Sequence, residues 1–416
     1  MKTINSSSTL TFRSKSLAVL IISFLGLFIM PLQSFAIDYY GVNGTTNIAT
    51  ATLTCWGTNL DGTGTNPTTF NNTADKFIIP VGCTMTLSAI ITLNGATLDV
   101  FGTLIGGTSP VKGTGAFILE TGGTLKTSNT NGVAASSGTS GAVQTTTKTF
   151  NAGANYEYNG TAAQTANNPT TANNIIISNT GGIISITNSI TALSGTFTVN
   201  PNATLNMGLK TLKGSGSFLL GAGATLKTSN TNATPITEAV GQLTGTKTFD
   251  PSANYTFSAA QTVDQSITEI TSANNIEINV TGTPANLTLS TPIRVTAVLT
   301  MTAGTLTLGD NNLTIASPDT YLSNPKILLT GTGRIVDKTT ELNMIKKDIL
   351  FYTSQNQLFV KGTAAGEMIT VYNTKGQTIT KVMATDNLTT INLKKGFYLL
   401  QLKSPTNVGS FKVVIN

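Results

Sequence analysis

The chain has 416 residues and contains no histidine, which excludes Ser-His-Asp and Cys-His catalysis in their usual forms. Two cysteines without histidine also cannot form a zinc site. The formal charge of +6 comes from the ends, because residues 37–340 carry 12 basic and 14 acidic residues whereas residues 341–416 carry nine and four. Nucleic-acid binding needs a clustered basic stripe, so we expect no nucleic-acid partner.

Residues 1–36 have the three parts of a secretory signal peptide. Three basic residues and no acid precede a 14-residue apolar run, Leu17 to Met30, which is followed by Pro31 and the small residues Ser34 and Ala36. The alternative is a membrane anchor, but this run is shorter than the roughly 20 residues that span a bilayer. We therefore expect cleavage after Ala36 and an exported mature protein.

Cys55 and Cys83 are expected to form a disulfide, because exported proteins fold in an oxidising compartment. Closing this loop would contribute about 3.5 kcal/mol by the chain-entropy estimate. The alternative is two separate buried thiols. The surrounding residues 37–90, which include the body's single tryptophan, Trp56, are interpreted as an N-terminal cap.

The body is an internal repeat. The segment "FILETGGTLKTSNTN" starts at Phe117, and "FLLGAGATLKTSNTN" starts 101 residues later at Phe218. "TKTFNAGANYEY" and "TKTFDPSANYTF" continue the match, and "MTAGTLTLGDNNLTI" opens a partial third copy. A repeat of this kind decides the fold, because each unit must bury its apolar face against the next.

Within a unit, apolar residues alternate with Thr, Ser, Asn or Lys, which predicts short β-strands. A string of β-sandwiches and a β-solenoid both fit such strands. Short segments, few aromatic residues and the lack of linkers favour the solenoid over residues 91–335. The predicted fold is therefore all-β: a right-handed parallel β-helix followed by a small C-terminal sandwich.

The body shows no catalytic pattern. Its acidic residues, among them Asp99, Glu120 and Glu157, are isolated in the sequence, whereas a catalytic carboxylate pair needs a defined separation. The loop at Asp61 lacks the ligand set of a calcium loop and is interpreted as a turn. We expect no enzyme activity, no metal and no cofactor. The tyrosines Tyr156 and Tyr255 are expected to pack inside strands, with stacking on sugars as the alternative.

The C-terminal part differs in composition. Residues 336–348 are charged and are interpreted as a linker. Seven strand-like segments follow in residues 349–416: "ILFYTS", "QLFVKG", "MITVYNT", "QTITKVM", "TTINLK", "FYLLQLK" and "SFKVVIN". Seven short alternating strands predict a small immunoglobulin-like sandwich.

Both parts resemble known families. The body, through "NNIIISNTGGIISITNSITALSGTFTV" and "AGTLTLGDNNLTI", resembles the β-helical surface proteins of Bacteroidota. The tail, through "VYNTKGQTI", "GFYLL" and "FKVVI", resembles the C-terminal sorting domain of type IX secretion cargo. The motif residues that match are Tyr372, Gly376, Gly396, Tyr398 and Lys412.

The resemblance implies export by the type IX secretion machinery, followed by attachment to surface lipopolysaccharide or by release. We therefore expect a structural or adhesin-like protein at the outer-membrane surface or outside the cell. Its partners would be glycans or the surfaces of host or neighbouring cells. The alternative is a β-helix that binds or processes polysaccharide.

Overall fold

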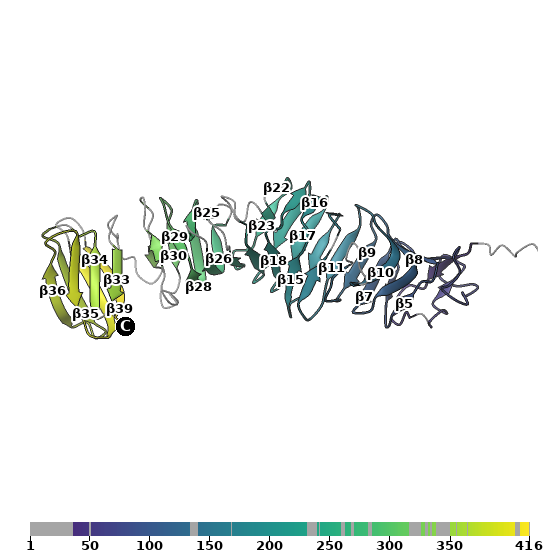
Figure 1. Ribbon diagram of the computed structural model, residues 1–416, viewed down its shortest axis with the longest axis horizontal. Helices are drawn as coiled ribbons and strands as arrows, with labels where there is room; N and C mark the ends of the chain where they lie inside the picture. The colour runs from purple at the N-terminus through teal and green to yellow at the C-terminus, as the bar shows by residue number, and fades with distance from the viewer. Residues whose placement is uncertain are drawn as a thin grey trace, which may run out of the picture.

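The computed structural model shows an elongated all-β molecule, with a long parallel solenoid and a small antiparallel domain at its C-terminal end (Figure 1). The structure describes residues 36–415 except for 50, 134–139, 168, 231–238, 241, 259–262, 268–269, 282–284, 316–325, 329–331, 333–334, 338–349, 355, 364 and 404–407. The predicted signal peptide, apart from Ala36, and most of the predicted linker lie outside the described residues. No helix in the described part is long and apolar enough to cross a membrane.

Within the described residues, five sheets form the solenoid. The first has seven strands, β1 (Asp38–Gly41), β2 (Trp56–Gly57), β3 (Lys76–Ile79), β5 (Ile91–Thr92), β6 (Thr97–Val100), β8 (Val111–Leu119) and β10 (Val143–Phe150). The second has eight, β4 (Thr84–Thr86), β7 (Thr103–Gly107), β9 (Thr124–Thr127), β11 (Asn155–Tyr158), β14 (Ile175–Ile177), β17 (Thr196–Val199), β20 (Ser217–Leu220) and β23 (Lys247–Phe249).

The third sheet has nine strands, β12 (Gln164–Ala166), β15 (Ile183–Ile186), β18 (Thr204–Gly208), β21 (Thr225–Thr228), β24 (Asn254–Phe257), β26 (Ser272–Asn279), β28 (Ile293–Ala303), β30 (Leu313–Ile315) and β32 (Ile335–Asp337). Two sheets have four strands each. One holds β13 (Thr171–Ala172), β16 (Ile190–Leu193), β19 (Leu212–Gly214) and β22 (Gln242–Leu243), and the other β25 (Val263–Ile267), β27 (Ala285–Leu289), β29 (Thr305–Thr307) and β31 (Lys326–Leu328).

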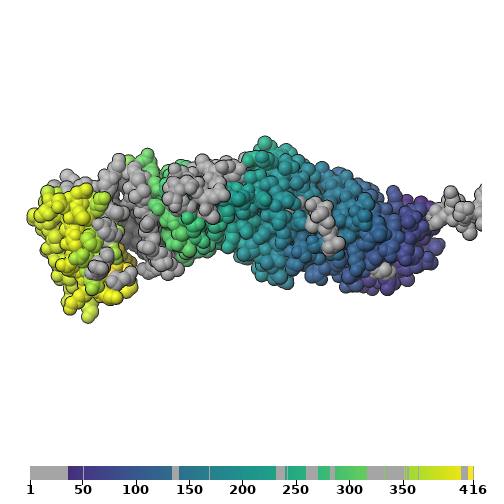
Figure 2. Space-filling model, viewed as in Figure 1, coloured from purple at the N-terminus to yellow at the C-terminus, as the bar shows by residue number. Residues whose placement is uncertain are grey.

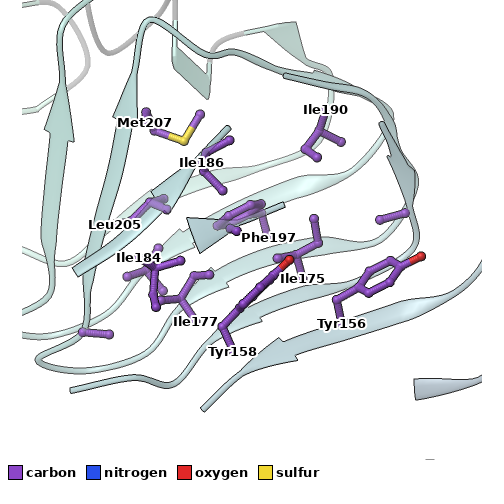
Figure 3. Close-up of a cluster of buried hydrophobic side chains, with 14 of the residues drawn as sticks. Tyr156, Tyr158, Ile175, Ile177, Ile184, Ile186, Ile190, Phe197, Leu205 and Met207 are labelled. Atoms are coloured by element: carbon purple, nitrogen blue, oxygen red, sulfur yellow. The ribbon is translucent and has the colours of Figure 1, made fainter. Parts of the chain in front are cut away.

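The solenoid core is built by stacking in register. Among the described strands of the body, all pairings are parallel except that of β1 with β2. Tyr156 lies over Ile175 and Ile175 over Phe197, all pointing inward (Figure 3). Phe197 in turn lies over the buried Phe218. One continuous hydrophobic cluster extends from Tyr39 to Ile315. The predicted solenoid is confirmed, and the alternative of separate sandwiches is wrong because no boundary divides this core.

The two copies of the repeat lie on different faces of the solenoid. In the first copy Phe117 lies in β8, and the "TLKT" segment Thr124–Thr127 forms β9 of the eight-stranded sheet. In the second copy Phe218 lies in β20 of that eight-stranded sheet, and its "TLKT", Thr225–Thr228, forms β21 of the nine-stranded sheet. The second copy is therefore displaced by one face. Each face requires only alternating inward apolar residues, so one segment suits any of them.

Asparagine side chains join successive coils at equivalent places in both copies. Asn155 Oδ1 accepts a hydrogen bond from Asn174 Nδ2 at 2.9 Å, and Asn254 Oδ1 accepts one from Asn275 Nδ2 at 2.7 Å. The same side chains donate to the coil before: Asn155 Nδ2 to Gly122 O and Asn254 Nδ2 to Gly223 O. The network is conserved between copies although the faces differ.

The predicted disulfide is wrong. Cys55 and Cys83 are both buried free thiols. The Cys55 thiol donates to Thr52 O at 3.1 Å, and that of Cys83 to Gly41 O at 3.5 Å, so each is oriented by a separate backbone carbonyl. Compartment and loop length, on which the prediction rested, carry no information about this geometry. Trp56 is fully buried at this end, edge-on to Phe77 at 5.3 Å.

The C-terminal domain contains all seven predicted strands. They are β33 (Leu350–Ser354), β34 (Gln357–Lys361), β35 (Met368–Asn373), β36 (Thr378–Met383), β37 (Leu388–Asn392), β38 (Gly396–Lys403) and β39 (Val408–Ile415). Two antiparallel sheets result, ordered β33-β34-β37 and β36-β35-β38-β39. A separate hydrophobic cluster, which includes Leu358, Ile369 and Leu400, fills the space between them.

Candidate functional site

The residues of the sorting motif converge on the four-stranded sheet of the C-terminal domain. Tyr372 lies in β35, Gly396 and Tyr398 in β38 and Lys412 in β39, and Gly376 lies in the turn between β35 and β36. Leu399 of β38 is the register partner of both Tyr372 and Lys412. Residues that are up to 40 positions apart in the sequence are thus placed on three adjacent strands.

The turn at Gly376 explains one of the motif glycines. The Asn373 side-chain oxygen accepts hydrogen bonds from the backbone N–H groups of Lys375 and Gln377, both at 2.9 Å. Gly376 has a φ of +77° and donates its N–H to Asn373 O at 3.0 Å. Only glycine takes this backbone conformation without steric cost, so the turn fixes how β36 folds back on β35.

Gly396 and Tyr398 form a second local unit at the start of β38. The Tyr398 hydroxyl donates to Lys394 O at 2.8 Å, across the residue that begins the strand. A side chain at Gly396 would lie 3.5 Å from the Tyr398 ring, and the φ of +155° there disfavours other residues. Gly376, Gly396 and Tyr398 therefore have local structural roles at the turns that lead into β36 and β38.

The outer face of the four-stranded sheet is apolar and basic. At one end of this face lie Phe397, which is 68% exposed, Val414 and Leu399. Phe397 and Val414 are register partners on neighbouring strands. We call this surface, with Lys403 and Lys412, the outer basic-apolar face. The sequence predicted that Phe397 and Leu399 share a side of β38, but alternation alone could not show which side the other sheet covers.

Residues 353–416 match the family model of the secretion system C-terminal sorting domain. This match supports export through the type IX secretion system and implies contact with its machinery. A sorting tail of this kind also implies a protein at the cell surface or outside the cell. Searches of the curated proteins and of the solved structures found no match to the chain.

Two acidic residues that are isolated in the sequence, Asp99 and Glu120, are neighbours in the folded body. Asp99, only 6% exposed, lies near Glu120 of the next coil. Burial and the charge of Glu120 raise the pKa of Asp99 to about 6, although Lys76 acts in the opposite sense. Asp99 Oδ1 has no hydrogen-bond partner, and Glu120 Oε2 accepts from Asn151 Nδ2 at 2.6 Å. The two acids are near-neighbours in space because Asp99 pairs with Ile118, two residues before Glu120.

A second polar cluster lies on the outside of the eight-stranded sheet. Lys126 Nζ and Glu157 Oε2 form an ion pair of 2.8 Å between neighbouring coils. Ser178 Oγ donates to Glu157 Oε1 at 2.9 Å and accepts from Asn200 Nδ2 at the same distance. These contacts join four successive coils, so the groups serve bonding between coils.

The other body residues considered in the sequence have structural surroundings. Tyr156 and Tyr255 are almost fully buried, which confirms that they pack inside the strands and excludes stacking on a sugar. Asp61 Oδ1 accepts from Thr63 N at 2.9 Å and from the Thr63 hydroxyl at 2.6 Å, as in an ordinary turn. Within the described residues, no three acidic or cysteine side chains are grouped so as to hold a metal ion.

Proposed function

We propose that this protein is a non-enzymatic structural or adhesin-like β-solenoid, delivered to the cell exterior by its C-terminal sorting domain. The proposal combines two parts. The tail supplies the export route, as its family match supports. The body supplies a continuous rod, visible as one extended surface in Figure 2.

The proposal rests on the bonds that the body's outward polar side chains form. These side chains bond one another between coils, as in Thr307 Oγ1 to Asn286 Oδ1 at 2.6 Å and Ser229 Oγ with Ser258 Oγ at 3.0 Å. The Lys126–Glu157 ion pair also joins neighbouring coils. Hydrogen-bonded side-chain rows stiffen a solenoid in which each coil contacts only its neighbours. A stiff rod suits a structural or adhesive part of the cell envelope.

Export is tested by deleting residues 353–416 from the full chain in a cell with type IX secretion. We expect the protein to disappear from the medium and the cell surface and to accumulate in the periplasm. Export of the shortened chain at the normal level would contradict the delivery route.

The role of the body is tested with cells that export the full chain and cells that lack it. Adhesion to surfaces and to neighbouring cells should fall without the protein. Purified full chain should also be incubated with polysaccharides and a glycan array. Polysaccharide cleavage would contradict the non-enzymatic proposal, and equal adhesion of both cell types would contradict the adhesive one.

A further inference from the structure

We infer that the outer basic-apolar face, formed by Phe397, Leu399 and Val414 with Lys403 and Lys412, is the surface by which the sorting domain docks on a protein of the secretion machinery. The inference rests on the proposed export function and assigns it to one face of the domain. The partner surface is expected to have an apolar centre and acidic groups around it.

Large apolar side chains are exposed on the outer face of the four-stranded sheet. A small soluble domain normally buries such residues or scatters them singly. Here Phe397 and Val414 are adjacent register partners, and Leu399 lies two residues along the same strand. An exposed aromatic residue at the centre of an apolar patch is the common anchor of protein interfaces.

The same sheet is also positively charged. The four strands of this sheet contain three lysines, Lys381, Lys403 and Lys412, and no acidic residue. A surface of one sign favours a partner of the opposite sign and rejects partners of its own sign. The partner should therefore present aspartate or glutamate around its apolar centre.

The other face of the domain fits this role less well. The outward side of β37 carries Leu388, Thr390 and Asn392, of which two are polar, and Gln357 of β34 bonds Asn392 at 2.9 Å. On the four-stranded sheet Phe397, Leu399 and Val414 are each at least 38% exposed, whereas Phe359, on the outer side of β34, is only partly exposed.

The arrangement of the lysines favours a protein over lipopolysaccharide. A phosphate group is bound best by cationic donors that converge on it. Lys412 pairs with Leu399, Lys381 with Thr370 and Lys403 with Met368, so none of these lysines is the register partner of another. Spread charges beside an apolar patch match a protein interface whose apolar part is bordered by polar groups.

The test uses the full chain in a type IX-competent cell, with the exported protein measured in the medium and on the cell surface. The variant Phe397→Ser with Leu399→Ser should lower total export at least tenfold. Because both side chains are exposed, the thermal unfolding midpoint of the purified variant should stay near that of the unchanged protein.

Two matched pairs of variants control for folding. Val414 and Leu388 are each 44% exposed and lie on opposite outer faces, so Val414→Ser should reduce export whereas Leu388→Ser should not. Lys403 and Lys361 are exposed residues that end strands of the two sheets. Lys403→Glu should reduce export and Lys361→Glu should leave it unchanged, and neither removes a packed group.

Each other outcome overturns the inference. Equal export of Val414→Ser and Leu388→Ser would show that this face is not the docking surface. Unchanged total export with a shift from the cell surface to the medium would show that the face holds the protein to lipopolysaccharide instead. If the deletion of residues 353–416 blocks export but the face variants do not, the export function stands and only the docking face is wrong.

Discussion

The solenoid and the C-terminal domain both bury apolar side chains between β-sheets, but the strands of the first are parallel and those of the second antiparallel. The body stacks parallel strands, so each coil adds to a core that extends from Tyr39 to Ile315. The tail pairs antiparallel strands into a closed domain around its own cluster. The two clusters share no residue, so their stabilities should be separable. Coils could be added to the body without changing how its core is built. The fold of the tail, in contrast, depends on particular residues at particular turns.

The largest expected effect tests whether the two cores are separate. Phe218 is buried between Phe197 and Phe249, with ring centroids 6.0 Å and 5.8 Å away. Phe218→Ala should cost about 3–5 kcal/mol of stability in the body, because it removes a large buried ring and leaves a cavity. Calorimetry of the full chain should show a lower transition for the body and an unchanged one for the tail.

The matched change in the tail is Leu400→Ala, which removes a fully buried side chain of β38. It should cost about 2–5 kcal/mol and lower only the transition of the tail. A single transition that moves with both variants would show that the two regions unfold together.

The second prediction tests whether the two repeat copies are equivalent although they lie on different faces. Asn155→Ala and Asn254→Ala each remove a side chain that links three coils. Each should cost about 1–3 kcal/mol, because partly buried amide donors lose their acceptor. Urea unfolding measures both, with Asn131→Ala at an exposed turn residue as a control. A large cost at only one site would mean that the face, rather than the repeated network, decides the stabilisation.

The sequence predicted the elements better than their arrangement. Alternation is a local property, so it identified the seven strands of the tail and the inward positions of Tyr156 and Tyr255. The face on which a strand lies depends on all the preceding coils, so the one-face displacement of the second copy was not predictable. The proximity of Asp99 and Glu120 was not predictable for the same reason, because the two residues belong to successive coils.

Some features of the candidate site were likewise predictable from the sequence, and others were not. The motif residues were found by resemblance, and the glycines have visible local causes in positive φ angles. The exposure of Phe397 was not predictable, since period-two patterning separates the two sides of a strand without saying which one is covered. The thiol orientations of Cys55 and Cys83 likewise depend on side-chain geometry that the sequence does not contain.

The third prediction uses pH. The pKa of Asp99 is raised to about 6 by burial and by Glu120, above the roughly 3.9 of an unfolded chain. Folding therefore favours the protonated acid, and stability is lost as pH rises through 6. Asp99→Asn should stabilise the body by about 1–2 kcal/mol at pH 8, after allowance for solvent screening, with little effect at pH 4.

Asp250 provides the control of opposite sign. Hydrogen bonds from the Ser252 hydroxyl and then from the Ser252 N–H lower the pKa of Asp250. Its contribution is present at neutral pH and is lost as pH falls through that lowered value. Asp250→Asn should therefore destabilise slightly at pH 7 and not in strong acid. Urea titrations at several pH values measure both variants, and equal pH profiles for the two would contradict the assignment.

The smallest expected effect compares tyrosine hydroxyls in the two regions. Tyr156 Oη and Tyr255 Oη are buried without a hydrogen-bond partner, whereas Tyr398 Oη donates to Lys394 O. Tyr156→Phe and Tyr255→Phe should leave the body unchanged or stabilise it by up to about 1 kcal/mol, because an unsatisfied buried polar group is removed. Tyr398→Phe should cost the tail about 0.5–1.5 kcal/mol, because a made bond is lost. Calorimetric midpoints measure all three. A clear loss of stability in Tyr156→Phe would mean that a bound water satisfies its hydroxyl inside the solenoid.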